Sequence, residues 1–321
     1  MAKESQNKDL HKAKSAKKDE FYTQLTDIEK EIRYYKEHFA GKTIYCNCDD
    51  PEWSNFFRYF ALNFEHLKLK KLIATHFVYS DLFVEGETYK LEITRGMDLN
   101  ADDRIDFSDV VKTILKDNGD FRSAECIELL NEADIVVTNP PFSLFREYVS
   151  QLIEYDKKFL IIGNVNAITY KEIFRLIKED RLWLGASIHS GDREFGVPDD
   201  YPLTAASSRI DKDGKKYIRV KGVRWFTNLD YKERHEDLIL FKKYTSEEYP
   251  TYDNYNAINV DATKDIPVDY KGDIGVPITF LDKYNPEQFE IVKFRKGLDE
   301  KDLSINGKCP YFRIIIKNKR L

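Results

Sequence analysis

The sequence has few cysteines and no long hydrophobic run. Its four cysteines, Cys46, Cys48, Cys126 and Cys309, are too few for a secreted disulfide scaffold, so a reducing cytoplasm is the simplest setting. The lysine-rich stretch 1–18 lacks the apolar centre of a signal peptide, and no later segment is apolar enough to span a membrane. These absences favour a cytoplasmic protein.

Glycine is also scarce, with 14 in 321 residues, whereas aromatic residues make up 14% and charged residues 33% of the chain. This composition argues against disorder, and the length allows one large domain or one domain with a smaller appendage. The net charge of −5 does not indicate a nucleic-acid binder. Lys and Arg nevertheless cluster in segments 1–18 and 293–320, where they are either candidates for phosphate contacts or a solvated tail and a solvated face.

Short apolar runs alternate with stretches of helical periodicity along most of the chain, which is typical of an α/β protein with a parallel sheet. Strands are predicted from Thr43 and at 69–78, 134–138, 159–163, 181–185 and 223–228, the last two around a polar excursion. Helix starts are predicted at the capping boxes Thr26–Glu29 and Thr169–Glu172, at Asp50 before Pro51, at Ser123 and at Ser143.

Segment 85–116 interrupts this alternation and is interpreted as a polar insertion with a hairpin around Gly86. Five of its residues have offsets that resemble a calcium-binding loop: Asp98, Asn100, Asp102, Asp106 and Asp109. However, Asp103 stands where such a loop needs glycine, Arg104 adds a positive charge, and no companion loop follows. Beyond residue 230 the chain becomes irregular and rich in Tyr and Asn, so we expect an arm at 1–18, a domain at 19–230 and a further region at 231–321.

The most informative stretch is the β-branched run that ends in Asn139-Pro140-Pro141-Phe142. Neither proline can continue a strand or a helix, and each restricts the residue before it. Asn139 is therefore expected in an extended conformation at the carboxyl end of a buried strand, where open α/β sheets bind ligands.

This turn has the groups needed to methylate an exocyclic amine on a planar base. Such an amine is a poor nucleophile because its lone pair is delocalised into the ring, and acceptors on both of its hydrogens would counter this. The side-chain oxygen of Asn139 and the carbonyl of Pro140 are candidate acceptors, and Phe142 could stack on the base. The alternative is that these four residues only form a tight turn that closes a strand.

The tetrapeptide resembles the Asn-Pro-Pro-aromatic motif of S-adenosylmethionine-dependent amino-methyltransferases, and the wider chain resembles the EcoRI-type adenine-specific (N6) DNA methyltransferase family. The resemblance spans nearly the whole chain outside the insertion. It is carried by segments 19–24, 45–51, 119–123, 134–145, 225–230, 275–281 and 302–312.

This resemblance implies a Rossmann-like, seven-stranded, mostly parallel methyltransferase sheet in 19–230 and a DNA target-recognition region in 231–321. It implies S-adenosyl-L-methionine as cofactor and assigns four groups of residues. Phe21, Tyr22 and Thr23 would close over the cofactor, Cys46, Asn47, Cys48 and Asp49 would lie under its methionine portion, Asp120 and Phe121 would meet its adenine, and Asn139, Pro140, Pro141 and Phe142 would hold the target adenine.

Two features depart from the usual methyltransferase pattern. The turn after the first strand lacks glycines, and no acidic residue closes the second strand at His76 or Phe77 to bind the ribose. Cys46 and Cys48 are interpreted as small buried residues and not as a metal site, because a single Cys-x-Cys has no further ligands.

The expected function is that of a site-specific DNA adenine-N6 methyltransferase acting on a flipped adenine, with GAATTC as the first target to test and its inner adenine as the acceptor. The resemblance further implies duplex DNA as substrate, a monomer, and either a restriction endonuclease with the same site, without a stable complex, or an orphan methylase. Two alternatives remain: another amino-methyltransferase, acting on RNA guanine or protein glutamine, and a catalytically silent DNA-binding module.

Overall fold

The computed structural model describes residues 21–77, 87–199, 201, 203 and 208–321. The chain forms two compact units, one made of residues 1–170 and 190–229 and the other of residues 171–189 and 230–321. The basic stretch 1–18 and the hairpin expected around Gly86 lie outside the described residues. In the part of the chain that is described, no helix has the length and apolar character needed to cross a membrane.

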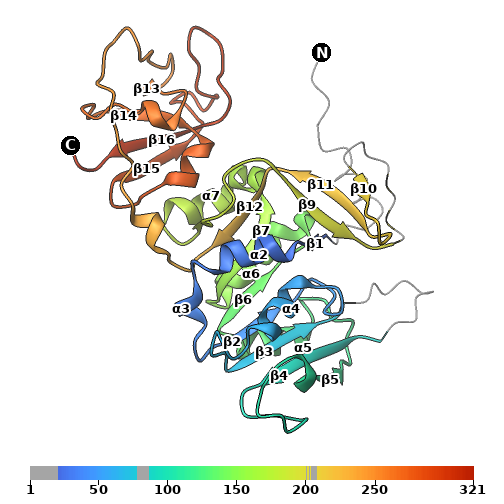
Figure 1. The fold of residues 1–321 in the computed structure, drawn as a ribbon. Helices are drawn as coiled ribbons and strands as arrows, with labels where there is room; N and C mark the ends of the chain where they lie inside the picture. Colours follow the sequence, from blue (N-terminus) through green and yellow to red (C-terminus); the bar gives the residue numbers. More distant parts are fainter. Residues whose placement is uncertain (1–20, 78–86, 200, 202, 204–207) are drawn as a thin grey trace. The chain divides into compact units, whose positions relative to one another are not determined.

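The largest sheet has eight strands in the order β5-β4-β3-β2-β6-β7-β12-β8, one more than the seven expected (Figure 1). Its strands are β2 (Thr43–Cys46), β3 (Lys71–Thr75), β4 (Tyr89–Thr94), β5 (Val111–Ile114), β6 (Ile135–Thr138), β7 (Lys158–Asn164), β8 (Trp183–Leu184) and β12 (Val223–Thr227). Strands β3, β2, β6 and β7 pair in parallel, whereas β4, β5 and β12 pair antiparallel to their neighbours. The expectation of a mostly parallel sheet therefore holds for the central four strands and fails for these three.

The segment expected to be a polar insertion supplies two of these strands. In β4 the buried residues Tyr89, Leu91 and Ile93 alternate with polar ones, and all four residues of β5 are exposed. An edge strand with polar side chains on one face has little overall hydrophobicity, which explains why it resembles an insertion in the sequence. The adjoining aspartates bind backbone amides: Asp109 accepts from the amides of Leu99 and Asp106.

Helices α4 (Asn55–Leu62), α5 (Ala124–Glu132) and α6 (Phe145–Glu154) connect or precede the parallel strands and pack on β3, β2 and β7. The chain passes from β2 outward to β3, then returns to β6 and continues outward to β7 on the other side. Strand order thus reverses between β2 and β6. In open α/β sheets this switch point, at the carboxyl ends of the strands, is where ligands bind.

Several helices begin at residues other than the cap residues predicted from the sequence. Ser123 caps α5 as predicted, accepting from the amide of Cys126. Asp50 instead forms a turn through its side chain, which accepts from Glu52, and Ser54 caps α4. Thr26 lies inside α2 (Leu25–Ile32), and Ser143 lies in a short 3-10 turn, η2 (Phe142–Leu144), that the Pro-Pro turn imposes before α6.

A second, smaller sheet in the first unit has the order β1-β9-β11-β10, with every neighbour antiparallel. It consists of β1 (Tyr22–Thr23), β9 (Asp192–Val197), β10 (Ser208–Ile210) and β11 (Lys216–Lys221). The first unit also contains α3 (Lys36–Phe39) and the 3-10 turns η1 (Phe107–Asp109) and η3 (Val165–Thr169). The sequence predicted only a polar excursion between residues 185 and 223, whereas β9 to β11 form a sheet there with the segment at Phe21.

The second unit contains helix α7 (Lys171–Lys178) and a four-stranded sheet in the order β13-β14-β16-β15. The strands are β13 (Ala257–Asn259), β14 (Asp273–Pro277), β15 (Phe289–Phe294) and β16 (Arg313–Asn318), and the 3-10 turns are η4 (Lys232–His235), η5 (Thr263–Asp265) and η6 (Ile278–Lys283). Tyr252, Ala257, Leu303 and Ile315 form part of its core. The region has more regular structure than its irregular sequence suggested.

Candidate active site

The catalytic turn expected from the sequence lies at the switch point, directly after β6. Asn139 is only 4% exposed, and its Nδ2 donates to the backbone carbonyl of Phe21. Because only the amide nitrogen can donate to a carbonyl, this bond orients the side chain. The Oδ1 atom of Asn139 is buried and has no hydrogen-bond partner among the described residues.

Two aromatic rings border this amide. Phe142, in the 3-10 turn after Pro141, is partly exposed, and its ring meets that of buried Phe21 edge to face with centroids 6.0 Å apart. Pro140 is buried, whereas Pro141 is partly exposed and its carbonyl accepts from the amide of Leu144. The turn therefore presents a buried amide oxygen beside an accessible ring.

The turn after β2 is fixed to its neighbours by side-chain hydrogen bonds. Asn47 accepts twice: its Oδ1 from the hydroxyl of Tyr148 on α6, and its backbone carbonyl from the hydroxyl of Thr138 on β6. Asp49 is 4% exposed and accepts from the hydroxyl of Ser54, 3.2 Å away, at the start of α4. These bonds hold the β2 and β6 strand ends together.

The two cysteines of this turn are not reactive thiolates. Burial raises the pKa of both the Cys46 and the Cys48 thiol well above the usual value, so both stay protonated at neutral pH. Cys48 has a positive φ of 77°, in the left-handed region that favours glycine. The turn thus adopts a backbone conformation that usually requires glycine, although Cys48 occupies the position. This explains why the glycines usual after the first strand of a methyltransferase are missing from the sequence.

Asp120 and Phe121 follow Gly119, which has a φ of +75° and lies so close to β3 that an added Cβ would be 2.1 Å from the His76 carbonyl oxygen. Asp120 binds the Arg122 guanidinium through both carboxylate oxygens, at 2.8 and 2.7 Å. Burial raises the pKa of Asp120, but the hydrogen bonds and charge of Arg122 outweigh this and lower it. The Phe121 ring meets Tyr148 edge to face at 5.0 Å.

The segment Phe21–Thr23 joins this site from the small sheet. Tyr22 and Thr23 pair with Gly196 and Phe195 of β9, and the Thr23 carbonyl accepts from Nδ2 of Asn55, 2.7 Å away. Thr23 is 2% exposed, and its hydroxyl has no hydrogen-bond partner within the described chain.

Hydrogen bonds and ring contacts thus link Phe21, Asn139, Phe142, Asn47 and Phe121 through a small set of neighbours, of which Tyr148, Thr138 and Ser54 were not identified as site residues from the sequence. Nothing local in the sequence shows that the Tyr148 hydroxyl reaches Asn47, 101 positions earlier. The described partners of Asp120 are all local, namely Asn118, Arg122 and Ser123, so no hydrogen bond among the described residues joins it to the turns after β2 and β6.

Comparison with known proteins gives a consistent assignment. The family model described as adenine-specific methyltransferase EcoRI matches residues 9–319. The chain is 58% identical over 324 residues to the Type II methyltransferase M.EcoRI of Escherichia coli, covering 100% of this chain and 99% of that protein. It is 39% identical to M.MgeORF184P of Mycoplasma genitalium and 37% identical to M.MpnI of Mycoplasma pneumoniae, both Type II methyltransferases, over 97% of this chain and 99% and 98% of theirs.

No solved structure gave a significant match. The family model and the relatives nevertheless agree over almost the full length, so the rival assignments to RNA, to protein or to a silent binding module are not supported. This chain belongs to the EcoRI family of adenine-specific DNA methyltransferases.

Proposed function

We propose that this enzyme transfers a methyl group from S-adenosyl-L-methionine to N6 of the inner adenine in duplex GAATTC, after flipping that adenine out of the helix. The observation that carries the chemistry is the buried, unpaired Oδ1 of Asn139. A buried acceptor without a partner costs about 1–3 kcal/mol, and an amine donor on a bound base would remove that cost. The 58% identity to M.EcoRI supports GAATTC as the target.

The residues of the turn have separate roles in this proposal. Asn139 Oδ1 and the Pro140 carbonyl accept the two amine hydrogens and draw the nitrogen lone pair out of conjugation with the ring. Phe142 stacks on the adenine and holds it in plane. The amine can lose its proton after attack, so no strong general base is required, and correct positioning supplies much of the rate enhancement.

The residues at the switch point fit a cofactor of this kind. When bound, S-adenosylmethionine supplies a sulfonium methyl that the amine can attack in line. Phe21, Tyr22 and Thr23 would border it, and the orphaned hydroxyl of Thr23 is a buried polar group that a ligand could satisfy. Cys46, Asn47, Cys48 and Asp49 would lie under its methionine portion, and Asp120 and Phe121 would meet its adenine.

The wider organisation is proposed on the same basis. Residues 19–230 would be the catalytic domain, with a Rossmann-like methyltransferase sheet, and residues 231–321 the target-recognition region, with 1–18 as a basic arm. Internal ion pairs occupy several basic side chains of the carboxyl-terminal region, including Arg295 with Asp302 and Arg313 with Asp261. Its DNA contacts would therefore come from fewer lysines and arginines than the sequence suggests.

We further propose a cytoplasmic monomer, with a restriction endonuclease of the same specificity acting separately on the site. The four free cysteines are consistent with a reducing compartment. Both strands of a GAATTC site would then be methylated in separate events.

The test is transfer of a labelled methyl group from S-adenosylmethionine to three duplexes that differ only at the site. The first contains GAATTC, the second has one base pair changed, and the third has the inner adenine replaced by purine, which lacks the N6 amine. We expect label on the first duplex alone. Equal labelling of the first and second duplexes would show that GAATTC is not the target sequence. Labelling of the third would show that the methyl group goes to an atom other than N6 of the inner adenine, and no label on any duplex would overturn the proposed reaction on DNA.

A further inference from the structure

A cavity of about 660 Å³ in the first unit is not accounted for by the proposed site. It lies between the small sheet, the loop that precedes α4, α4 itself and η1. Of the residues expected at the cofactor or the target adenine, only Tyr22 lines it. This volume is within the range of about 300–1,000 Å³ that is typical of small-molecule sites.

One wall of the cavity contains a row of residues on three strands of the small sheet: Tyr22 on β1, Gly196 on β9 and Tyr217 on β11. Gly196 on β9 is paired with Tyr22 on one side and with Tyr217 on the other, and Tyr217 is paired with Arg209. Directly paired residues project to the same face of a sheet. Two tyrosine side chains therefore flank a glycine that has no side chain. The slot between them is bordered closely on the Tyr22 side, where ring atom Cδ2 lies 3.9 Å from the position that an added Gly196 Cβ would take.

The spacing of the strands is that of a stacking site. Two strand spacings separate the backbones of Tyr22 and Tyr217, a distance of about 9–10 Å. A planar ring with a stacking partner on each side needs about 7–8 Å, twice the optimal carbon–carbon contact distance. One nucleobase could therefore lie over Gly196 with a tyrosine on either side.

The ring of Tyr217 is held in place from its far side. The Arg209 guanidinium lies 4.2 Å from its centroid, and Arg209 is in turn bound by both carboxylate oxygens of Glu194, at 2.8 and 2.5 Å. The Tyr217 hydroxyl donates to Asp211, 3.1 Å away. A ring fixed in this way loses little conformational freedom when a ligand stacks on it.

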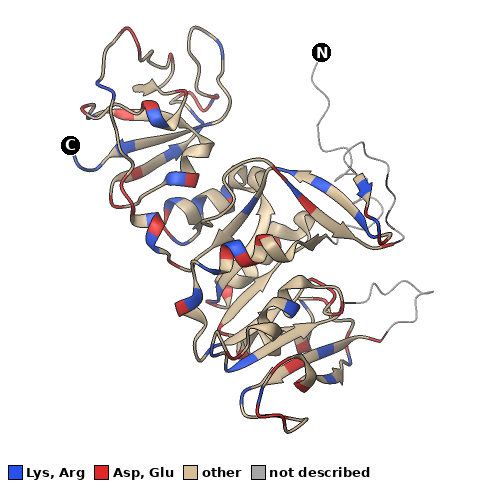
Figure 2. Cartoon of the chain, in the orientation of Figure 1, with Lys and Arg blue, Asp and Glu red and all other residues tan. Residues whose placement is uncertain are grey.

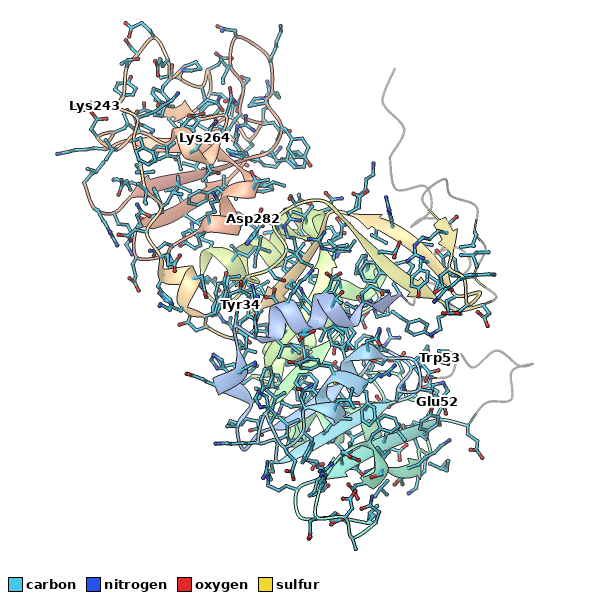
Figure 3. All side chains as sticks on the ribbon, in the orientation of Figure 1. Tyr34, Glu52, Trp53, Lys243, Lys264 and Asp282 are labelled. Carbon is cyan, nitrogen blue, oxygen red and sulfur yellow. The ribbon has the colours of Figure 1, made fainter. Side chains whose placement is uncertain are left out.

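Positive charge lies at the rim of the cavity. Arg58 on α4 is exposed and makes no side-chain hydrogen bond or ion pair within the described residues. The Lys215 side chain likewise makes none there, because only its backbone amide and carbonyl are bonded, both to Asp211. Glu52 and Asp199 also line the cavity and oppose them, and Lys216 donates to the Asp199 carbonyl. Trp53 is 62% exposed and adds a second aromatic surface; Figure 3 labels it beside Glu52.

The cavity continues into a basic hairpin. Segment 208–221 contains six Lys or Arg residues and two Asp residues, and Figure 2 shows this positive charge along β10 and β11. Aromatic rings beside unpaired cations, next to a basic strand, are the features with which proteins bind nucleic-acid strands. Tyr22 directly follows Phe21, whose carbonyl accepts from Asn139, so one residue separates the slot from a direct contact with the catalytic turn.

We propose that this cavity binds one nucleotide of the DNA strand that carries the target adenine, with its base over Gly196 between Tyr22 and Tyr217 and its phosphate at Arg58 and Lys215. This proposal rests on the proposed function. A nucleotide stacked here would stabilise the opened duplex while the neighbouring adenine occupies the catalytic turn. The small sheet, and not only the second unit, thus binds DNA.

The test measures the Kd of the full-length protein for a GAATTC duplex by fluorescence anisotropy, for wild type and five variants. Tyr217→Ala is expected to weaken binding about tenfold, the loss typical of one stacked base, whereas Tyr217→Phe keeps the ring and stays within about threefold. Gly196→Ala is expected to weaken binding by a similar factor. The fold has room for this methyl group, because the nearest atom to an added Cβ is 3.5 Å away.

Arg58→Ala tests the phosphate contact. It is expected to lower the slope of log Kd against log salt by about one, the effect of one lost phosphate contact. Lys36→Ala, an exposed cation on α3 away from the cavity, is the matched control and should leave both the affinity and the slope unchanged. Thermal unfolding of each variant, compared with wild type, would identify any that fails to fold.

Unchanged DNA affinity in both Tyr217→Ala and Gly196→Ala would overturn the inference. Weaker binding of S-adenosylmethionine, measured without DNA, together with unchanged DNA affinity would assign the cavity to the cofactor and also overturn it. Methyl transfer by wild type on the same duplex separates the two proposals. Transfer with unaffected variants would reject only the nucleotide site, whereas no transfer by wild type would reject the proposed function itself.

Discussion

The two strand ends that meet at the switch point use their polar groups differently. After β2, Asn47 accepts hydrogen bonds from Tyr148 and Thr138, and the Asp49 carboxylate accepts one from Ser54. After β6, Asn139 is equally buried, but only its nitrogen has a partner and its Oδ1 has none in the described structure. One strand end is saturated, and the other keeps an acceptor open.

This difference suggests separate roles for the two strand ends, one in positioning the site and one in the reaction. A buried polar group is nearly always paired, because leaving it unpaired costs about 1–3 kcal/mol. The saturated β2 end contributes rigidity, since each of its bonds fixes one strand or helix relative to the next. The open acceptor at Asn139 is a cost that a ligand with an amine donor removes, so it is the group we expect to act on the target base.

The largest expected effect is on the open acceptor. Asn139→Ala should lower methyl transfer about 10²- to 10³-fold, the loss typical of one preorganised polar group that acts in the transition state. The exposed Asn131, on α5, provides a matched control, and Asn131→Ala should keep the wild-type rate. Initial rates with labelled S-adenosylmethionine and a GAATTC duplex measure both. A wild-type rate for Asn139→Ala would show that the open acceptor is not catalytic.

The next effect is on the saturated end and should appear in stability. Tyr148→Phe removes the hydroxyl that satisfies Asn47 Oδ1 and keeps the ring that packs against Phe121. We expect the free energy of unfolding to fall by about 1–3 kcal/mol, the cost of an unpaired buried acceptor. Transfer at saturating cofactor should fall far less than in Asn139→Ala.

Urea denaturation measures the stability change. The control is Tyr155→Phe, seven positions after Tyr148, at the end of the same helix. Tyr155 is the carboxyl-terminal cap residue of α6, and its hydroxyl makes no hydrogen bond within the described residues, so this change should stay within about 0.5 kcal/mol. If Tyr148→Phe reduced transfer as strongly as Asn139→Ala without loss of stability, the distinction between the two strand ends would be wrong.

The open end could be predicted from the sequence because its determinants are local. A β-branched run followed by two prolines defines a buried strand and an extended Asn139 without reference to the rest of the chain. Its partner could not be predicted in this way, since the Phe21 carbonyl is 118 positions earlier and depends on how the small sheet meets the large one. The saturation of Asn47 by Tyr148 is hidden for the same reason.

Errors in the predicted fold also have local causes. Asp50 before Pro51 has the pattern of a helix cap, but its carboxylate closes a turn, and the helix begins four residues later at Ser54. Strand β4 alternates buried apolar residues with Lys, Glu and Thr, so its composition resembled that of an insertion. In both cases a short-range pattern was compatible with two structures, and tertiary packing selected the one that had not been predicted.

A smaller effect is expected from the backbone strain at the saturated end. Cys48→Gly removes a side chain from a φ of 77° and should stabilise the fold by about 0.5–1 kcal/mol, because glycine adopts this region without steric cost. Lys68→Gly, at a φ of 54° near the start of β3, tests the same relief away from the site. If only Cys48→Gly also lowers the affinity for S-adenosylmethionine, the thiol contributes to cofactor binding as well as to the turn.

The smallest effect concerns the pH dependence of stability at Asp120. Burial raises the pKa of this carboxyl, but Arg122 lowers it below the usual value. A carboxyl with a lowered folded-state pKa stabilises the fold above its unfolded pKa, near 4, and that contribution is lost as the pH falls through the folded-state value. Arg122→Leu should therefore flatten the loss of stability below about pH 4.

The change should amount to less than about 1 kcal/mol, because the Arg122 side chain is 48% exposed and solvent screens the pair. Urea unfolding between pH 3 and pH 7 measures it, with Arg33→Leu, an exposed arginine whose described hydrogen bond is to Tyr34, as the control. If instead S-adenosylmethionine binding weakened at pH 7 in Arg122→Leu but not in Arg33→Leu, Arg122 would be positioning Asp120 for the cofactor. Asp120 would then act on a ligand, like the open strand end after β6, and not only contribute to stability, like the saturated end after β2.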